Sequence, residues 1–168
     1  TLVETYLDGE TQANKLETKP SEEVKTLLRL GTLCCDGVVV FDGDKEQHIG
    51  DPTETAIVLA AHKNGMPKES LAKQYPRLAD VMEPLCTSGN LSQARLVMEE
   101  MSERALRVLA VAYKEIDKIP DEKSMMTLEG DLHFCGLVGM IDPPRPEAKA
   151  AVARCRKAGI KPVMITGD

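Results

Sequence analysis

Three residues at the end of the printed sequence, Thr166, Gly167 and Asp168, combine a hydroxyl, a flexible backbone and a carboxylate. Together such groups can orient a phosphoryl group and its magnesium ion. They follow the stretch 161–165, which predicts a short buried strand running into a loop, and α/β sheets place ligands at that end of their strands. Taken alone, Thr-Gly-Asp is more often a plain turn, so the preceding sequence has to decide.

A second group of polar residues lies in the stretch GDPTETAIVLAAHKNG. Asp51 is placed as a helix N-cap, Pro52 stands at the first helical position, and Glu54 follows the cap by three residues, which is the spacing of a capping box. We therefore expect a helix that Gly65 ends. This capping role is compatible with a further role for Glu54, because a helix start lines up its neighbours toward a pocket.

Arg107 is a third candidate, in the stretch ALRVLAVAY. Apolar residues alternate around it as they do in a strand, at Leu106, Val108, Ala110 and Ala112. The forked donors of a guanidinium suit a phosphate group. The alternative is an exposed arginine on an edge strand, which would have no ligand.

The elements that must position these residues alternate between helix and strand. Ser21 caps a helix over SEEVKTLLRLGTLCC, GVVVFDGDKEQHIG predicts a strand, a turn and a polar return, and ARLVMEEMSER predicts a helix that ends near Arg104. DLHFCGLVGMID predicts another strand and PEAKAAVARCRKAGI another helix. Antiparallel strands with helices, followed by one helix–strand step typical of a parallel sheet, predict an α+β fold with a short α/β addition.

Charge and composition exclude several classes of protein. The net charge of −6 argues against nucleic acid as a partner, because phosphate backbones need a basic surface. No stretch of about eighteen apolar residues spans a membrane, and no signal peptide is evident. The five cysteines and three histidines are scattered without the spacing of metal ligands, so we expect reduced thiols and no metal site built from them.

The stretches GDPTETA (50–56), ALRVLAVAYKE (105–115) and GMIDPPRPEAKAAVARCRKAGIKPVMITGD (139–168) resemble the P-type cation-pumping ATPases, and among them the calcium-pump branch. The resemblance extends over most of the chain and is most specific in the last stretch. It implies an antiparallel sheet flanked by helices, which forms a nucleotide-binding domain inserted into a phosphorylation domain of the haloacid-dehalogenase type.

The resemblance also implies domain boundaries. Residues 1–141 would form the nucleotide-binding domain, 142–145 the hinge that returns to the phosphorylation domain, and 146–168 the start of the second half of that domain. Two consecutive prolines in the hinge fix φ and resist helix formation, so they suit a stiff connector.

The same resemblance implies roles for the candidate residues, with ATP and Mg²⁺ as cofactors. Thr53 and Glu54 match positions that contact the adenine side of ATP, Asp51 matches an acidic position nearby, Arg107 an arginine near the triphosphate, and Leu109 a residue of the pocket wall. Thr166, Gly167 and Asp168 match the catalytic loop that meets the aspartyl phosphate.

Some family landmarks are absent. The phosphorylated Asp is expected just before Thr1, and two stretches with an adenine-stacking Phe and a pocket Lys are expected between Asp80 and Leu85. Neither Phe41 nor Phe134 stands at a matching place, and a second discontinuity is expected near 88–91. Two explanations stay open: segments missing from the printed chain, which we favour because exposed loops and strand ends commonly lose order, or a deletion that would weaken ATP binding.

The sequence thus predicts the cytosolic ATP-binding domain of an integral membrane P-type ATPase that transports a cation, with calcium expected. Its partners would be ATP and the rest of its own chain, namely the actuator, phosphorylation and transmembrane domains. Membrane contact would come only through the full-length protein, and the fragment would not be catalytically complete. The alternatives are a cap-bearing soluble phosphatase of the dehalogenase-like superfamily and a non-catalytic regulatory domain.

Overall fold

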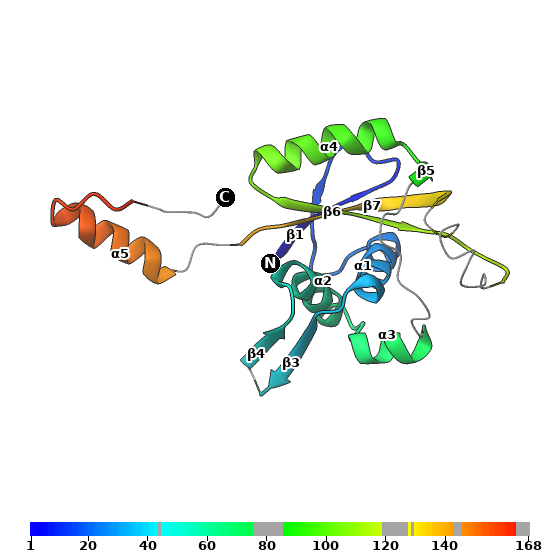
Figure 1. Ribbon diagram of the computed structural model, residues 1–168, viewed down its shortest axis with the longest axis horizontal. Helices are drawn as coiled ribbons and strands as arrows, with labels where there is room; N and C mark the ends of the chain where they lie inside the picture. The colour runs from blue at the N-terminus through cyan, green and yellow to red at the C-terminus, as the bar shows by residue number, and fades with distance from the viewer. Residues whose placement is uncertain (44, 76–85, 119–127, 129, 143–145, 164–168) are drawn as a thin grey trace.

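The computed structural model describes residues 1–43, 45–75, 86–118, 128, 130–142 and 146–163. Within them, a mainly antiparallel sheet is built on the central strand β7 (Leu132–Met140). Strands β1 (Leu2–Leu7) and β6 (Arg107–Tyr113) both pair antiparallel with β7, as Figure 1 shows. The expected α+β fold with an antiparallel sheet is confirmed.

Two short strands complete the described sheet. Strand β2 (Asn14–Lys15) pairs antiparallel with β1, and β5 (Cys86–Ser88) pairs parallel with the start of β7. The sequence analysis missed β5, because three residues are too few to show a periodic pattern.

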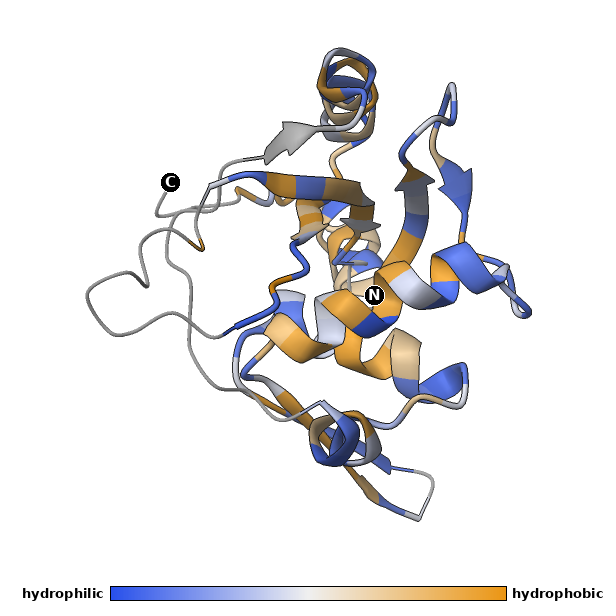
Figure 2. Cartoon of the chain, turned by 90° about the vertical axis from the view of Figure 1, so that its right-hand side faces the viewer, coloured by the Kyte–Doolittle hydropathy of each residue, from blue (hydrophilic) through white to orange (hydrophobic). Residues whose placement is uncertain are grey.

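Helices cover both faces of the sheet. Helices α1 (Glu22–Cys34) and α2 (Pro52–Lys63) lie on one face and α4 (Leu91–Glu103) on the other, as Figure 1 shows. Each face has its own buried cluster. The first contains Leu27, Leu28, Ile57, Val58, Val111 and Val138, and the second contains Tyr6, Val97, Met101, Phe134 and Leu137. Figure 2 shows the hydrophobic residues gathered where the helices meet the sheet.

Helix α2 is buried on almost every side, which its apolar sequence explains. Beside it stands a separate hairpin of β3 (Val38–Asp42) and β4 (Lys45–Ile49). The Phe41 ring stacks on His62 with centroids 4.2 Å apart, and Lys63 Nζ lies 2.9 Å from Glu46 Oε1. These two contacts attach the hairpin to the last turn of α2.

Thr1 and Ile141, which are far apart in the sequence, lie side by side at one end of the sheet. The Thr1 nitrogen donates to the Ile141 carbonyl at 2.7 Å, and the Ile141 nitrogen donates to the Thr1 carbonyl at 2.9 Å. Beyond this point α5 (Pro146–Lys157) lies away from the sheet in Figure 1. Among the described residues, no helix combines the length and the apolar character that crossing a membrane requires.

Several local predictions were right, one helix was missed and one expected strand was wrong. Ser21 and Asp51 cap α1 and α2 through their side chains, and Gly65, with φ of +78°, follows the end of α2. Helix α3 (Lys68–Gln74) was not predicted. The stretch 161–163 is exposed and forms no strand, so the buried strand expected there is wrong for these residues. An exposed Lys-Pro pair at its start gives it no apolar face to bury.

Candidate functional site

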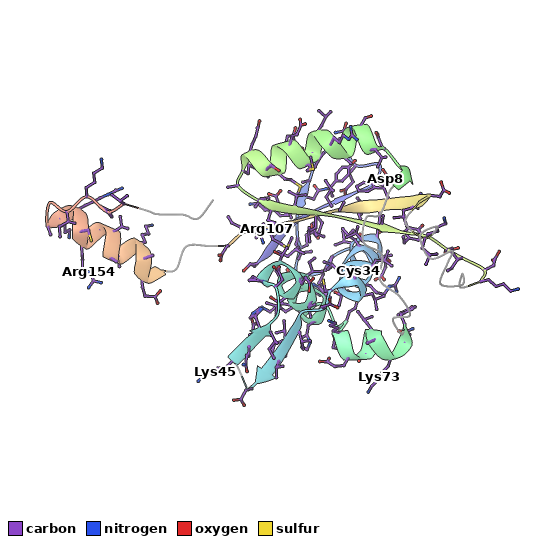
Figure 3. All side chains as sticks on the ribbon, in the orientation of Figure 1. Asp8, Cys34, Lys45, Lys73, Arg107 and Arg154 are labelled. Carbon is purple, nitrogen blue, oxygen red and sulfur yellow. The ribbon has the colours of Figure 1, made fainter. Side chains whose placement is uncertain are left out.

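The Arg107 and Thr53 side chains are hydrogen-bonded to each other at the end of the sheet where strand β7 ends. Arg107 is the first residue of β6 and pairs in register with Met140, the last residue of β7. Its Nη1 donates to Thr53 Oγ1 at 2.6 Å, in the first turn of α2. Figure 3 shows Arg107 on the side of the sheet that faces α5. The structure therefore brings together two of the residues that the sequence singled out.

Asp51 shapes this corner as the N-cap of α2. Its Oδ1 accepts a hydrogen bond from the Thr53 nitrogen at 2.7 Å, which turns Thr53 toward Arg107. Hydrogen bonds from Thr53, with a smaller contribution from the Arg107 charge, lower the pKa of the Asp51 carboxyl below its usual value. A carboxylate, a hydroxyl and a guanidinium thus occupy one exposed corner.

Glu54 has a different partner from the one expected. In a capping box its carboxylate would accept from the Asp51 nitrogen. Instead Glu54 Oε2 accepts from the nitrogens of Asp36 and Gly37, at 2.8 and 2.7 Å. The capping-box prediction is therefore wrong for Glu54, although Asp51 does cap the helix. The two amides of the loop before β3 are near enough to take the carboxylate from its local partner.

Lys68 also binds this loop, through its carbonyl oxygens. The sequence analysis did not identify Lys68 as a candidate residue. Lys68 Nζ donates to the carbonyl oxygens of Cys35, Asp36 and Gly37 at 2.7, 3.0 and 2.8 Å. Glu54 and Lys68 thus bind the amides and the carbonyls of one short segment, 35–37. No signal in the sequence marks this lysine, because α3, the helix that it begins, was not predicted.

Two glycines allow this segment to lie against the start of α2. A Cβ on Gly50, whose φ is +105°, would come within 2.9 Å of Gly37 Cα. A Cβ on Gly37 would come within 2.9 Å of Thr55 Cγ2 and 3.2 Å of Glu54 Cβ. A glycine is therefore required at position 50 both by its positive φ and by its close packing against Gly37.

Leu109 lies two residues after Arg107 on β6, so both side chains point to the same side of the strand. It is 38% exposed and pairs in register with Val138. An exposed apolar side chain beside a guanidinium is a surface on which a flat, partly apolar ligand with an anionic end can lie. The corner of Asp51, Thr53, Arg107 and Leu109 is called the α2–β6 corner below.

A cavity of about 210 Å³ lies elsewhere, against the side of α2 that faces β1 and the loop after β2. Residues from β1, this loop and α2 line it, among them Leu2, Leu16, Ala56, Leu59 and Ala60. None of the predicted site residues is among its lining residues. The α2–β6 corner is thus separate from this cavity.

The predicted catalytic residues Thr166, Gly167 and Asp168 lie outside the described residues, as do 143–145 of the expected hinge. Within the part that the structure describes, no three His, Cys, Asp or Glu side chains gather closely enough to hold a metal ion.

Comparison with known proteins gives a family. Residues 23–82 and 86–147 match the family model described as P-type ATPase, cytoplasmic domain N. The match includes Asp51, Thr53, Glu54, Arg107 and Leu109, and it leaves residues 83–85 unmatched. That gap adjoins the place where the sequence predicted a break in the resemblance.

Curated relatives agree with the family match. The cation-transporting ATPase pma1 of Synechocystis is 34% identical over 198 residues, which cover 95% of this chain and 22% of that protein. The calcium-transporting ATPase 1 of Lactococcus lactis is 33% identical over 212 residues, covering 100% and 23%. The calcium-transporting ATPase of Bacillus subtilis is 31% identical over 209 residues, covering 95% and 22%.

Two differences in length follow from these alignments. The chain spans between a fifth and a quarter of the length of these relatives. The alignments also run over at least 198 residues against a chain of 168, so each relative has 30 or more residues in the matched region without a counterpart here.

Proposed function

The chain belongs to the family of P-type ATPase cytoplasmic N domains, and from this premise we propose that it binds ATP at the α2–β6 corner. The observation that carries the proposal is the hydrogen bond of 2.6 Å between Arg107 Nη1 and Thr53 Oγ1. It joins the start of β6 to the capped start of α2. Both residues were named from the sequence as nucleotide contacts.

The chemistry of the corner suits the two ends of a nucleotide. A guanidinium binds phosphate oxygens through parallel donors. Leu109 offers an apolar surface to the base or the ribose. Asp51 repels phosphate, and so we expect the triphosphate on the Arg107 side and the base toward α2.

Magnesium would enter this domain with the nucleotide. When bound to ATP it neutralises part of the triphosphate charge. Asp168, by the resemblance, belongs to the loop that would meet Mg²⁺ in the phosphorylation domain. Residues 1–141 would then hold the nucleotide, 142–145 would act as the hinge, and 146–168 would begin the catalytic half.

For the whole protein, we propose an ATPase that transports a cation across a membrane. The names of the relatives support a cation pump, and two of the three name calcium. The phosphoryl group would pass from ATP to an Asp outside this chain. This domain would lie on the cytosolic side, and the actuator, phosphorylation and transmembrane domains would be its partners. The family match supports a pump rather than the phosphatase alternative.

Titration calorimetry with ATP, in the presence and absence of Mg²⁺, tests nucleotide binding by the chain. We expect a dissociation constant in the high micromolar to millimolar range. The reason for weak binding is that neither phenylalanine of the chain is available at the corner to stack on the base: Phe41 stacks on His62 and Phe134 is buried. No heat of binding at millimolar ATP would contradict the proposal and favour the non-catalytic regulatory domain.

A further inference from the structure

The segment 35–37 is bound by opposite charges on its two kinds of backbone group. Glu54 Oε2 accepts from the amides of Asp36 and Gly37 at 2.8 and 2.7 Å. Lys68 Nζ donates to three carbonyls, those of residues 35, 36 and 37, at 2.7 to 3.0 Å. Such charge-assisted hydrogen bonds are about twice as strong as neutral ones.

Lys68 and Glu54 also each place a charge of favourable sign at a helix end. Helix α1 ends at Cys34 with no basic residue in its last turn, so its negative end has no cation of its own. Lys68, the first residue of α3, brings an ammonium group to the carbonyl of the α1 C-cap, Cys35. Glu54 lies in the first turn of α2, where a negative charge is favoured.

We propose that Glu54 and Lys68 are positioning residues that clamp segment 35–37 and thereby fix the first turn of α2, which carries Thr53 to Arg107. The link is short. Glu54 follows Thr53 directly, and Gly37 packs against Gly50, one residue before the Asp51 cap. This inference rests on the proposed ATP site for its functional consequence, but the clamp itself is measurable without ATP.

The proposal gives Glu54 a different task from adenine contact. Its Oε2 accepts from two amides, and moving it to a ligand would break both of these hydrogen bonds. Lys68 cannot reach the ligand by the same reasoning, because its ammonium group is directed to three carbonyl oxygens. Both residues would therefore act on nucleotide affinity through the position of Thr53.

Amide hydrogen exchange measured by NMR tests the clamp directly. We expect Glu54→Gln and Lys68→Met each to speed exchange at the Asp36 and Gly37 amides about tenfold or more, and to shift the Thr53 amide resonance. Lys73→Met is the matched control, because Lys73 is an exposed lysine in the last turn of the same helix. Unchanged exchange in both clamp variants would overturn the proposal.

Chemical rescue separates positioning from a loss of general stability. In Lys68→Ala, methylammonium can restore N–H donors to the three carbonyls, whereas tetramethylammonium, at the same ionic strength, has none to give. We expect methylammonium alone to restore slow exchange at Gly37 and the wild-type Thr53 resonance. Equal effects of the two salts would contradict the clamp.

Measurements of ATP affinity test whether the clamp affects nucleotide binding. We expect Glu54→Gln and Lys68→Met to weaken ATP binding about three- to tenfold, with no added loss when Arg107→Ala is already present. If wild-type protein binds no ATP, the proposed function fails, and exchange at Asp36 and Gly37 still decides the clamp. If ATP binds equally to wild type and both variants, the positioning role is wrong and the proposed function stands.

Discussion

Arg107 and Thr53, 54 residues apart in the sequence, are joined by a hydrogen bond of 2.6 Å between Nη1 and Oγ1. One residue begins a strand of the main sheet, and the other lies in the first turn of a buried helix. Three separate features hold them in place: the pairing of β6 with β7, the Asp51 cap and the contacts of segment 35–37. The corner is therefore positioned by contacts within the protein itself.

Replacing Arg107 tests the phosphate contact. Because a hydrogen bond to a charged group is worth about 1.5–3 kcal/mol, we expect Arg107→Ala to weaken ATP binding about 10- to 100-fold by calorimetry. Arg107→Lys should retain part of the affinity, since it keeps the charge and loses the fork. Arg95→Ala, an exposed arginine on α4, is the control. Equal affinity of Arg107→Ala and Arg95→Ala would contradict this role.

Gly50→Ala tests the packing of α2 against segment 35–37. The new Cβ would meet Gly37 Cα at 2.9 Å, and φ at Gly50 is +105°. We expect a loss of about 2 kcal/mol or more in the free energy of unfolding by urea. Gly65→Ala is the control, because its φ is +78° and its Cβ would meet nothing, so about 1 kcal/mol is expected. A smaller loss at Gly50 than at Gly65 would contradict the close packing.

Arg104 and Glu4 form an ion pair that joins the end of α4 to β1. Arg104 Nη1 lies 2.6 Å from Glu4 Oε1, and the Glu4 side chain is only 12% exposed. Arg104→Met leaves this carboxylate without its cation, so we expect a loss of about 1–3 kcal/mol in the free energy of unfolding. The double variant Glu4→Gln, Arg104→Met should lose less than the sum of the two single changes. Strict additivity would show that the pair contributes nothing.

The buried thiol of Cys35 makes the free energy of unfolding depend on pH in the alkaline range. Burial, and secondarily the Glu54 charge, raises the pKa of its thiol from 9.0 to about 12. The Cys35 thiol loses its proton at lower pH in the unfolded chain than in the folded one. The stabilisation that follows from this difference is fully present below about pH 9 and is lost as pH rises toward 12. Over this range the free energy of unfolding falls by at most about 1.4 kcal/mol per pH unit. Cys35→Ala should flatten the fall in urea-measured stability over this range, whereas Cys155→Ala should not. The same slope in wild type and Cys35→Ala would refute the shift.

The helix start at GDPTE was predictable because its signals are local: a capping side chain, a proline at the first helical position and a glycine at the end. The meeting of Arg107 with Thr53 was not readable from spacing. It depends on the register of β6 on β7 and on the packing of α2 beneath the sheet. The family resemblance assigned both residues to one pocket, which stays a prediction; the structure shows that their side chains are hydrogen-bonded.

The parts that failed are those decided by distant partners. Glu54 has the spacing of a capping box, but the amides of Asp36 and Gly37, 18 and 17 residues earlier, take its carboxylate. Lys68 lies in a polar stretch with no periodic pattern, and because α3 was not predicted, nothing in the sequence marked it. Strand β5 is too short to have a pattern at all.

The most direct test of the account is a titration of ¹⁵N-labelled protein with MgATP followed by NMR. We predict that the largest shifts fall on the amides of Asp51, Thr53, Arg107 and Leu109, and that they vanish in Arg107→Ala. Shifts confined to the cavity between α2 and β1, around Leu16 and Leu59, would show that the nucleotide binds elsewhere. No shifts at saturating millimolar MgATP would contradict nucleotide binding by this chain.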